Sequence, residues 1–302
     1  RLDDFKRLPL DKIWFDSETK GEIWTSLKFY GESVTTENPK GYTFEIRLYN
    51  TEKRMDIACS IVKKSITDPE SFYIAFPFEL KDGKHFTEVQ GGVMETGKDQ
   101  IKGSSNDWNT VQTFTSVRNP SSQIVIGSAE MPLMQFGAIN TGRYQAGAMP
   151  ESTKLFSWPM NNYWVTNFNA DQRGGHSWTY YLTTSADYTN NFATQFGWGC
   201  RVPYLTRIIP GAGNGDNNWE GSFIKGWPTN VVLVTAQPTN DGKYLLVHLR
   251  ETAGKNAEIM LVNGLSGGVF QISEVDVTGN NIANGNTTVG PLETKFFKIS
   301  LK

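Results

Sequence analysis

Tyr42-Thr-Phe-Glu-Ile-Arg-Leu-Tyr49 alternates apolar residues with more polar ones along its length. Successive side chains of an extended strand point to opposite faces, so Tyr42, Phe44, Ile46 and Leu48 would share one face. Alternation of this kind is typical of a strand that buries one face and leaves the other in water. The stretch therefore predicts a half-buried β-strand.

The same alternation recurs along the chain, with turn-forming residues between the segments that carry it. The further strands that it predicts are residues 71–76, 123–128, 178–183, 244–249 and 296–301. No segment holds the 3.6-residue apolar spacing and the capping residues of a long helix. We therefore expect an all-β chain, built as a large antiparallel sandwich with long connections.

A break in this pattern lies at Pro210-Gly-Ala-Gly-Asn-Gly-Asp-Asn-Asn218, which is too rich in Gly and Asn to hold regular structure. Downstream, short alternating stretches follow at close spacing, as in a small β-sandwich. We predict two domains, a β-domain over residues 1–218 and a C-terminal β-sandwich over residues 219–302. The alternative is that the break is an insertion within one domain.

The composition of the chain limits the classes of partner that it could bind. The chain has 302 residues, 38% of them hydrophobic, and its 29 basic and 31 acidic residues give a net charge of −2. Because the charges are spread without runs, the sequence offers no basic surface for nucleic acid. No stretch approaches the roughly 20 apolar residues that cross a bilayer. We expect neither a nucleic-acid nor a membrane partner, and a periplasmic, secreted or cytoplasmic location is left open.

The two cysteines are too few for a disulfide framework and too isolated for a metal site. Cys59 and Cys200 both have apolar or aromatic neighbours in the sequence. Free cysteines with such neighbours are usually buried. We expect two buried thiols, each in a strand of a packed sheet.

Residues for catalysis or metal binding are not grouped. The histidines His85, His176 and His248 are far apart, and none has a second ligand at a chelating offset. We expect His85 and His248 to be structural or surface residues, and only His176 to be a candidate for a functional role. Motifs of nucleophile elbows and phosphate loops are missing, and the sequence cannot show which acids would flank a glycosidic bond. We therefore predict no catalytic residue and no metal ligand.

Three segments concentrate Trp, Tyr, Asn, Asp and Gln, namely residues 99–112, 157–173 and 194–201. A sugar ring packs its apolar C–H face on an aromatic ring, and its hydroxyls need planar donors and acceptors. The same residues also serve structure, because buried Asn side chains bond to loop backbones and Trp fills cores. Both interpretations stay open for these segments.

Five stretches, in the same order as in one known family, carry a resemblance. They are Leu48-Tyr-Asn-Thr-Glu-Lys-Arg-Met-Asp56, Ser71-Phe-Tyr-Ile-Ala-Phe-Pro-Phe78, Asp99-Gln-Ile-Lys-Gly-Ser-Ser-Asn-Asp-Trp-Asn-Thr-Val-Gln112, Asn162-Tyr-Trp-Val-Thr-Asn167 and Gly290-Pro-Leu-Glu-Thr-Lys-Phe296. On these motifs the chain resembles the C-terminal β-domains of glycoside hydrolase family 38, the zinc-dependent retaining α-mannosidases. The resemblance implies a galactose-mutarotase-like supersandwich, incomplete at its N-terminus, followed by a small β-sandwich.

The resemblance also implies what this chain lacks. The family's zinc ligands and catalytic aspartates lie on an N-terminal barrel, which no segment here resembles. No cofactor is therefore expected in this chain, and zinc is expected in the missing catalytic domain. The implied partners are the N-terminal catalytic and helical domains of the same enzyme and a mannose-containing carbohydrate. The residues predicted to bind substrate are Asp99, Gln100, Asp107, Trp108, Gln112, Asn162, Trp164 and Asn167.

These observations lead to one main hypothesis and two alternatives. The chain would be the non-catalytic C-terminal part of an α-mannosidase-like glycoside hydrolase, inactive alone, which supports the catalytic domain and contributes loops to the substrate cleft. The first alternative is a free-standing carbohydrate-binding β-sandwich. The second is an aldose epimerase, which would need an acid/base pair such as His with Glu facing the sugar.

Overall fold

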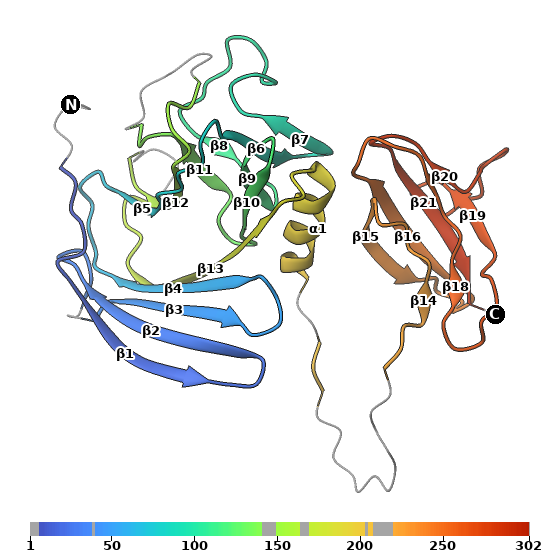
Figure 1. Ribbon diagram of the computed structural model, residues 1–302, viewed down its shortest axis with the longest axis horizontal. Coiled ribbons are helices and arrows are strands. Elements are labelled where there is room, and N and C mark those ends of the chain that lie inside the picture. Colours follow the sequence, from blue (N-terminus) through green and yellow to red (C-terminus); the bar gives the residue numbers. More distant parts are fainter. Residues whose placement is uncertain are drawn as a thin grey trace, which may run out of the picture. The chain divides into compact units, whose positions relative to one another are not determined.

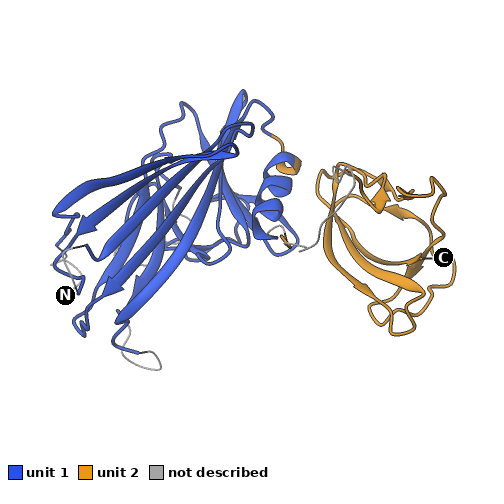
Figure 2. Ribbon diagram, turned by 90° about the horizontal axis from the view of Figure 1, so that it is seen from below, with its two compact units in different colours: residues 1–188, 192–202 blue, residues 189–191, 203–302 orange. Residues whose placement is uncertain are grey.

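The computed structural model describes residues 6–37, 40–140, 149–163, 169–202, 205–207 and 220–301. The chain divides into two compact units, one of residues 1–188 and 192–202, the other of residues 189–191 and 203–302 (Figure 2). The predicted domain boundary between residues 218 and 219 lies outside the described residues. Antiparallel strands make up most of both units, which confirms the all-β fold class, a supersandwich followed by a small β-sandwich.

A nine-stranded antiparallel sheet forms most of the first unit (Figure 1). Its strands, in spatial order, are β1 (Lys12–Lys20), β2 (Trp24–Glu32), β3 (Tyr42–Tyr49), β4 (Met55–Lys63), β13 (Gly174–Ser185), β10 (Ser122–Gly127), β9 (Phe114–Asn119), β6 (Lys84–Val89) and β7 (Gly92–Glu95). The alternating stretch 42–49 is β3, as predicted. Tyr42 on this strand is only 2% exposed and belongs to the core.

A four-stranded sheet packs on one face of the large sheet. Its strands, in spatial order, are β5 (Ser71–Phe76), β12 (Leu155–Asn161), β11 (Leu133–Phe136) and β8 (Asn109–Thr110). Phe76 and Leu155 from this sheet join Ile61 from the large sheet in one buried apolar cluster. Tyr180 of the large sheet also donates its hydroxyl to Ser157 Oγ at 2.8 Å across the core. Apolar burial, with this buried hydrogen bond, therefore joins the two layers.

The helix α1 (Asn190–Arg201) corrects two sequence predictions. No helix was expected, and Cys200, predicted in a strand, lies in its last turn. Helix propensity does not predict α1, because the helix contains Gly197. Glycine is needed at this position because a Cβ there would lie 2.7 Å from a ring carbon of Phe114. The helix packs closely on the large sheet, where Ala193, Phe114 and Val125 form a buried cluster. Tertiary packing stabilises this helix despite its weak helix formers.

The second unit is a smaller β-structure. A four-stranded sheet holds β15 (Val231–Pro238), β16 (Tyr244–Glu251), β21 (Thr294–Ser300) and β19 (Ile272–Val275), and two-stranded sheets pair β14 (Ile224–Lys225) with β18 (Val262–Asn263) and β17 (Ala257–Glu258) with β20 (Thr288–Val289). Val247, Leu249 and Phe297 are fully buried in its core. Across the described part of the chain, no helix has the length and apolar character to span a membrane.

Candidate functional site

Residues 99–112 connect the two sheets of the first unit. They follow β7 at the edge of the large sheet, and within them β8 pairs with β11 of the four-stranded sheet. The side chains of Asp99 and Gln100 hold the start of this connection. Asp99 Oδ2 accepts the N–H of Glu95 at 2.7 Å, and Gln100 Nε2 donates to Asn109 Oδ1 at 2.9 Å. Gln100 Oε1 also accepts the N–H of Gly97 at 2.9 Å, so both side chains fix the local backbone, while that of Asp99 stays exposed.

Asp107, Trp108 and Gln112 differ in exposure. Asp107 is 5% exposed, and its N–H donates to Ser105 Oγ at 3.3 Å. Trp108 is half-buried, whereas the side chain of Gln112 is exposed and its N–H donates to the carbonyl of Glu88 at 3.0 Å. The connection thus offers carboxylate, indole and amide groups at its surface or just below it.

Trp108 belongs to an aromatic group that we call the Trp158 cluster, made of Tyr73, Trp108, Trp158 and Tyr163. Trp158 is 3% exposed and meets the edge of Trp108 with ring centroids 5.7 Å apart. Tyr73 stacks on Trp158 at 5.7 Å, and Tyr163 lies 6.1 Å away. Burial raises the pKa of the Tyr73 hydroxyl. The cluster joins the 99–112 connection to the residues that follow β12, so two of the predicted segments meet here.

Asn162 lies next to this cluster in sequence, and its side chain serves the backbone. It is 4% exposed, and its Oδ1 accepts the N–H of Glu70 at 2.6 Å. Its Nδ2 donates to the carbonyls of Ile66 at 3.0 Å, Asp68 at 3.1 Å and Ala170 at 2.9 Å. Each polar atom of the amide is therefore engaged with a loop, in line with the structural interpretation of such residues.

Two predicted site residues, Trp164 and Asn167, lie outside the described residues. The Asn-Tyr-Trp-Val-Thr-Asn motif is therefore seen only at Asn162 and Tyr163. Its start places an amide in the loop scaffold and a ring in the Trp158 cluster.

Sequence reasoning missed a buried carboxylate in the same unit. Glu88 on β6 is fully buried, and its Oε1 accepts the indole N–H of Trp198 at 2.8 Å. Its Oε2 accepts the hydroxyl of Thr113. Glu88 therefore ties α1 to the large sheet. No signal in the sequence marked it, because its partners lie 25 and 110 residues away.

The three histidine side chains lie within hydrogen-bonding distance of groups of the fold. His85 is buried and donates from Nε2 to the carbonyl of Ser152 at 2.8 Å, and burial lowers its pKa. His176, the candidate for a functional role, donates from Nε2 to the carbonyl of Gln172 at 3.0 Å, while His248 lies 2.6 Å from a threonine hydroxyl of β21. Among the residues that the structure describes, no three His, Cys, Asp or Glu side chains form a group that could hold a metal ion. The donors that zinc requires are thus not gathered in this part of the chain.

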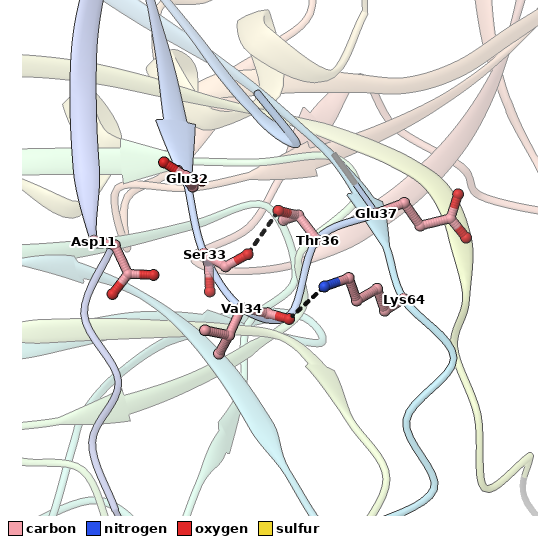
Figure 3. Close-up of a pocket in the computed structure, with 7 residues that line it drawn as sticks. All are labelled: Asp11, Glu32, Ser33, Val34, Thr36, Glu37 and Lys64. Atoms are coloured by element: carbon pink, nitrogen blue, oxygen red, sulfur yellow. Dashed lines mark hydrogen bonds between the residues drawn. The ribbon is translucent and has the colours of Figure 1, made fainter. Parts of the chain in front are cut away.

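A pocket of about 280 Å³ lies elsewhere on the first unit (Figure 3). Its lining is Asp11, Glu32, Ser33, Val34, Thr36, Glu37 and Lys64. Lys64 Nζ donates to the carbonyl of Val34 at 3.1 Å, and Thr36 Oγ1 donates to the carbonyl of Ser33 at 2.9 Å. Of the predicted substrate-binding residues that the structure describes, none lines this pocket, and its described lining holds no aromatic ring for a sugar to stack on.

Comparison with known proteins gives a likeness in fold. No protein-family model matches the chain, and no curated protein matches it significantly. An α-mannosidase from Enterococcus faecalis V583 aligns with a TM-score of 0.69 at 10% identity, over 96% of this chain and 35% of that one. A protein in the glycosyl hydrolase family 38 from Enterococcus faecalis aligns with a TM-score of 0.69 at 11% identity, over 95% and 36%. The chain thus spans about a third of the length of these proteins.

Proposed function

We propose that this chain is the C-terminal, non-catalytic part of an α-mannosidase-like glycoside hydrolase. In this proposal it supports the catalytic domain and contributes the 99–112 connection to the rim of a cleft for a mannose-containing carbohydrate. The likeness in fold supports it, because almost the whole chain aligns with a third of an α-mannosidase. The remaining two thirds of such an enzyme would carry the zinc and the catalytic carboxylates.

The observation that carries the proposal is an apolar surface on the large sheet. Paired residues Phe15, Phe29, Phe44, Cys59 and Trp178 run in register across five strands and share the face that forms the core. Trp178 and Cys59 are 3% and 4% exposed beneath the four-stranded sheet, whereas Phe15 on β1 is 59% exposed. The core face of the sheet therefore continues beyond the layer that covers it.

We call this uncovered region the apolar shelf. It consists of Ile13, Phe15, Leu27, Phe29, Ile46 and Leu48. Ile13 is 62% exposed and Leu48 is 46% exposed. Among the residues that the structure describes, the edge strand β1 pairs only with β2, so its other side presents unpaired backbone groups. A contiguous apolar face beside an open sheet edge is typical of an interaction surface, and we assign the catalytic part of the same enzyme as its partner.

The proposed rim consists of residues from the 99–112 connection. Asp99 and Gln112 have exposed side chains, and Trp108 keeps part of its ring accessible. A ring flanked by carboxylate and amide groups can pack against a pyranose and bond its hydroxyls. The Trp158 cluster would hold the ring of Trp108 in position from below. Asn162 has a supporting role in this arrangement, because its amide is engaged with the backbone.

The mass of the native polypeptide tests the proposal. An antibody against this chain should detect, in extracts of the source organism, a band far above 33.8 kDa. That polypeptide, purified and supplied with zinc, should hydrolyse an aryl α-mannoside, while the chain alone should not. A band at 33.8 kDa that purifies with no larger protein would refute the proposal.

Variants in the complete enzyme test the rim separately. Trp108→Ala and Gln112→Ala should raise KM or lower kcat, because both side chains are proposed to meet the substrate. Ile101→Ala is the matched control, since Ile101 belongs to the same connection and is 86% exposed. Unchanged kinetics in both rim variants would exclude a role of this connection in the cleft.

A further inference from the structure

The strands that carry the apolar shelf have a second face, and its side chains are aromatic and charged. In the register of β2, β3 and β4, Trp24 lies opposite Tyr49, and Arg47 lies opposite Asp56. Alternation places these residues on the face away from the core. With two neighbours they form a group that we call the Trp24 platform, made of Trp24, Glu45, Arg47, Tyr49, Arg54 and Asp56.

The inner end of the platform is fixed by ion pairing. Arg54 forks onto the carboxylate of Asp56, with Nε 2.7 Å from Oδ1 and Nη2 3.2 Å from Oδ2. Tyr49 donates its hydroxyl to the same carboxylate at 2.8 Å. The guanidinium also lies 5.0 Å from the ring centroids of both Tyr49 and Tyr181. Bidentate pairing and flanking rings restrict these side chains to one arrangement before any ligand arrives.

The outer end of the platform is open. Trp24 is 36% exposed, its ring lies 5.9 Å from that of Tyr49, and the guanidinium of Arg47 lies 5.7 Å from its centre. Arg47 forks onto Glu45 at 2.8 and 3.1 Å, and these two side chains are 38% and 29% exposed. An indole, a guanidinium and a carboxylate are thus held side by side and in contact with water.

The charges of the platform select the chemistry of its ligand. Each guanidinium is paired with a carboxylate, so the four charged groups cancel. The hydrogen bond from Arg47 lowers the pKa of Glu45 and so favours its ionised form. Lys28 lies opposite Glu45 on β2 and adds a positive charge beside these pairs, with the carboxylate of Asp16 near it. A neutral sugar ring would find an aromatic surface for its C–H face and a rigid donor and acceptor pair for vicinal hydroxyls.

We propose that the Trp24 platform binds a neutral hexopyranose unit of a glycan, without turnover. The sugar ring packs on Trp24, and its hydroxyls bond to Arg47 and Glu45. Tyr49, Arg54 and Asp56 are positioning residues, because they hold the tyrosine ring against which Trp24 rests. The platform is separate from the 99–112 connection, and its binding does not depend on the function proposed above.

Titration of the chain with simple sugars tests the platform. The probes are methyl α-mannopyranoside and an α-linked mannobiose, followed by NMR, with the open-chain polyol mannitol as a ligand lacking a ring face. We expect saturable, millimolar binding of the two sugars and none of mannitol. Trp24→Ala should weaken binding at least about tenfold, and Arg47→Lys, which keeps the charge but loses the fork, should also weaken it.

A matched control variant makes the result specific. Tyr244 matches Trp24 in exposure, at 37%, and in having a cation over its ring, with Lys298 Nζ 5.7 Å from the centroid. Because Tyr244 lies outside the platform, Tyr244→Ala should leave sugar affinity unchanged. Circular dichroism checks that each variant is folded. If Trp24→Ala does not fold, Arg47→Lys tests the platform in its place.

Two outcomes would overturn the assignment. One is the absence of saturable binding to the wild-type chain. The other is wild-type affinity in folded Trp24→Ala and Arg47→Lys chains, above all if Trp108→Ala alone abolishes binding. Neither outcome bears on the mass of the native polypeptide, so the platform and the proposed function can fail independently.

Discussion

Replacing Asn162 with alanine separates a structural role of this amide from a role in substrate binding. The wild-type side chain accepts one backbone hydrogen bond and donates two N–H groups among three carbonyls, at 2.6–3.1 Å. A buried hydrogen bond of this kind contributes about 1 kcal/mol net, so losing three should lower the free energy of unfolding by about 3 kcal/mol. For a unit of roughly 200 residues, that loss corresponds to a decrease in Tm of about 6–12 °C.

Differential scanning calorimetry of the chain measures this change. Asn50→Ala is the matched control, because Asn50 also donates to two carbonyls, those of Gly21 and Glu22 at 3.0 and 2.8 Å, but is exposed. Water can replace those bonds, so the control should lose less than about 1 kcal/mol. Asn162→Asp should be at least as destabilising as Asn162→Ala, since its second oxygen would face three carbonyl oxygens.

The reasoning would be wrong if Asn162→Ala melted like the wild-type chain while KM of the complete enzyme rose. The amide would then be a substrate ligand, and the bonds to the loops would contribute nothing to stability. A loss of stability without a change in KM supports the structural role.

Three further predictions concern the core and α1. Burial lowers the pKa of His85, so below about pH 6.5 the unfolded chain binds more protons than the folded chain. The free energy of unfolding should therefore fall as the pH falls. His85→Gln should reduce this pH dependence, as measured by urea titrations at pH 5 and pH 7. Burial raises the pKa of Cys59 and of Cys200 to about 12, so iodoacetamide should label neither in the folded chain and both in denaturant, as read by mass spectrometry. Gly197→Ala places a Cβ 2.7 Å from a ring carbon of Phe114 on β9, so it should lower the free energy of unfolding by about 1–3 kcal/mol in chemical denaturation. The Cβ of Gly199→Ala meets nothing within 4 Å, so this variant should raise the free energy of unfolding. Labelling of Cys59 in the folded chain would contradict the burial of β4. Labelling of Cys200, or equal effects of the two glycine variants, would contradict the packing described for α1.

Strands were predictable here because their pattern is local. Residues 42–49 and 71–76 alternate in polarity, and both are strands with those bounds. The helix was not predictable, because α1 contains Gly197 and Gly199 and is stabilised by what lies beneath it. The close approach to Phe114 that Gly197 permits is a tertiary contact, and propensity holds no information on it.

The residue types of the candidate site can be read from the sequence, but their arrangement cannot. Sugar binding by residues 99–112 stays a prediction from their aromatic and amide content, and the contact of Trp108 with Trp158 depends on the pairing of β8 with β11. Asn162 reaches loops that begin 92 to 96 residues earlier in the chain. Glu88 has no motif around it, and its environment arises when α1 packs on the large sheet. Each of these features depends on contacts between residues far apart in the chain, which a local sequence pattern does not reveal.

Strand β3 contributes side chains to both of the surfaces that we propose to bind partners. Phe44 and Ile46 lie on the face of the apolar shelf, while Glu45, Arg47 and Tyr49 lie on the face of the Trp24 platform. Because side chains alternate with a period of two, a shift of one residue in the register of β3 would exchange these faces. The buried Tyr42 at the start of the strand opposes that shift, since it would leave the core. Packing at one end of β3 thus fixes both surfaces, and substitutions on one face should leave binding at the other unchanged.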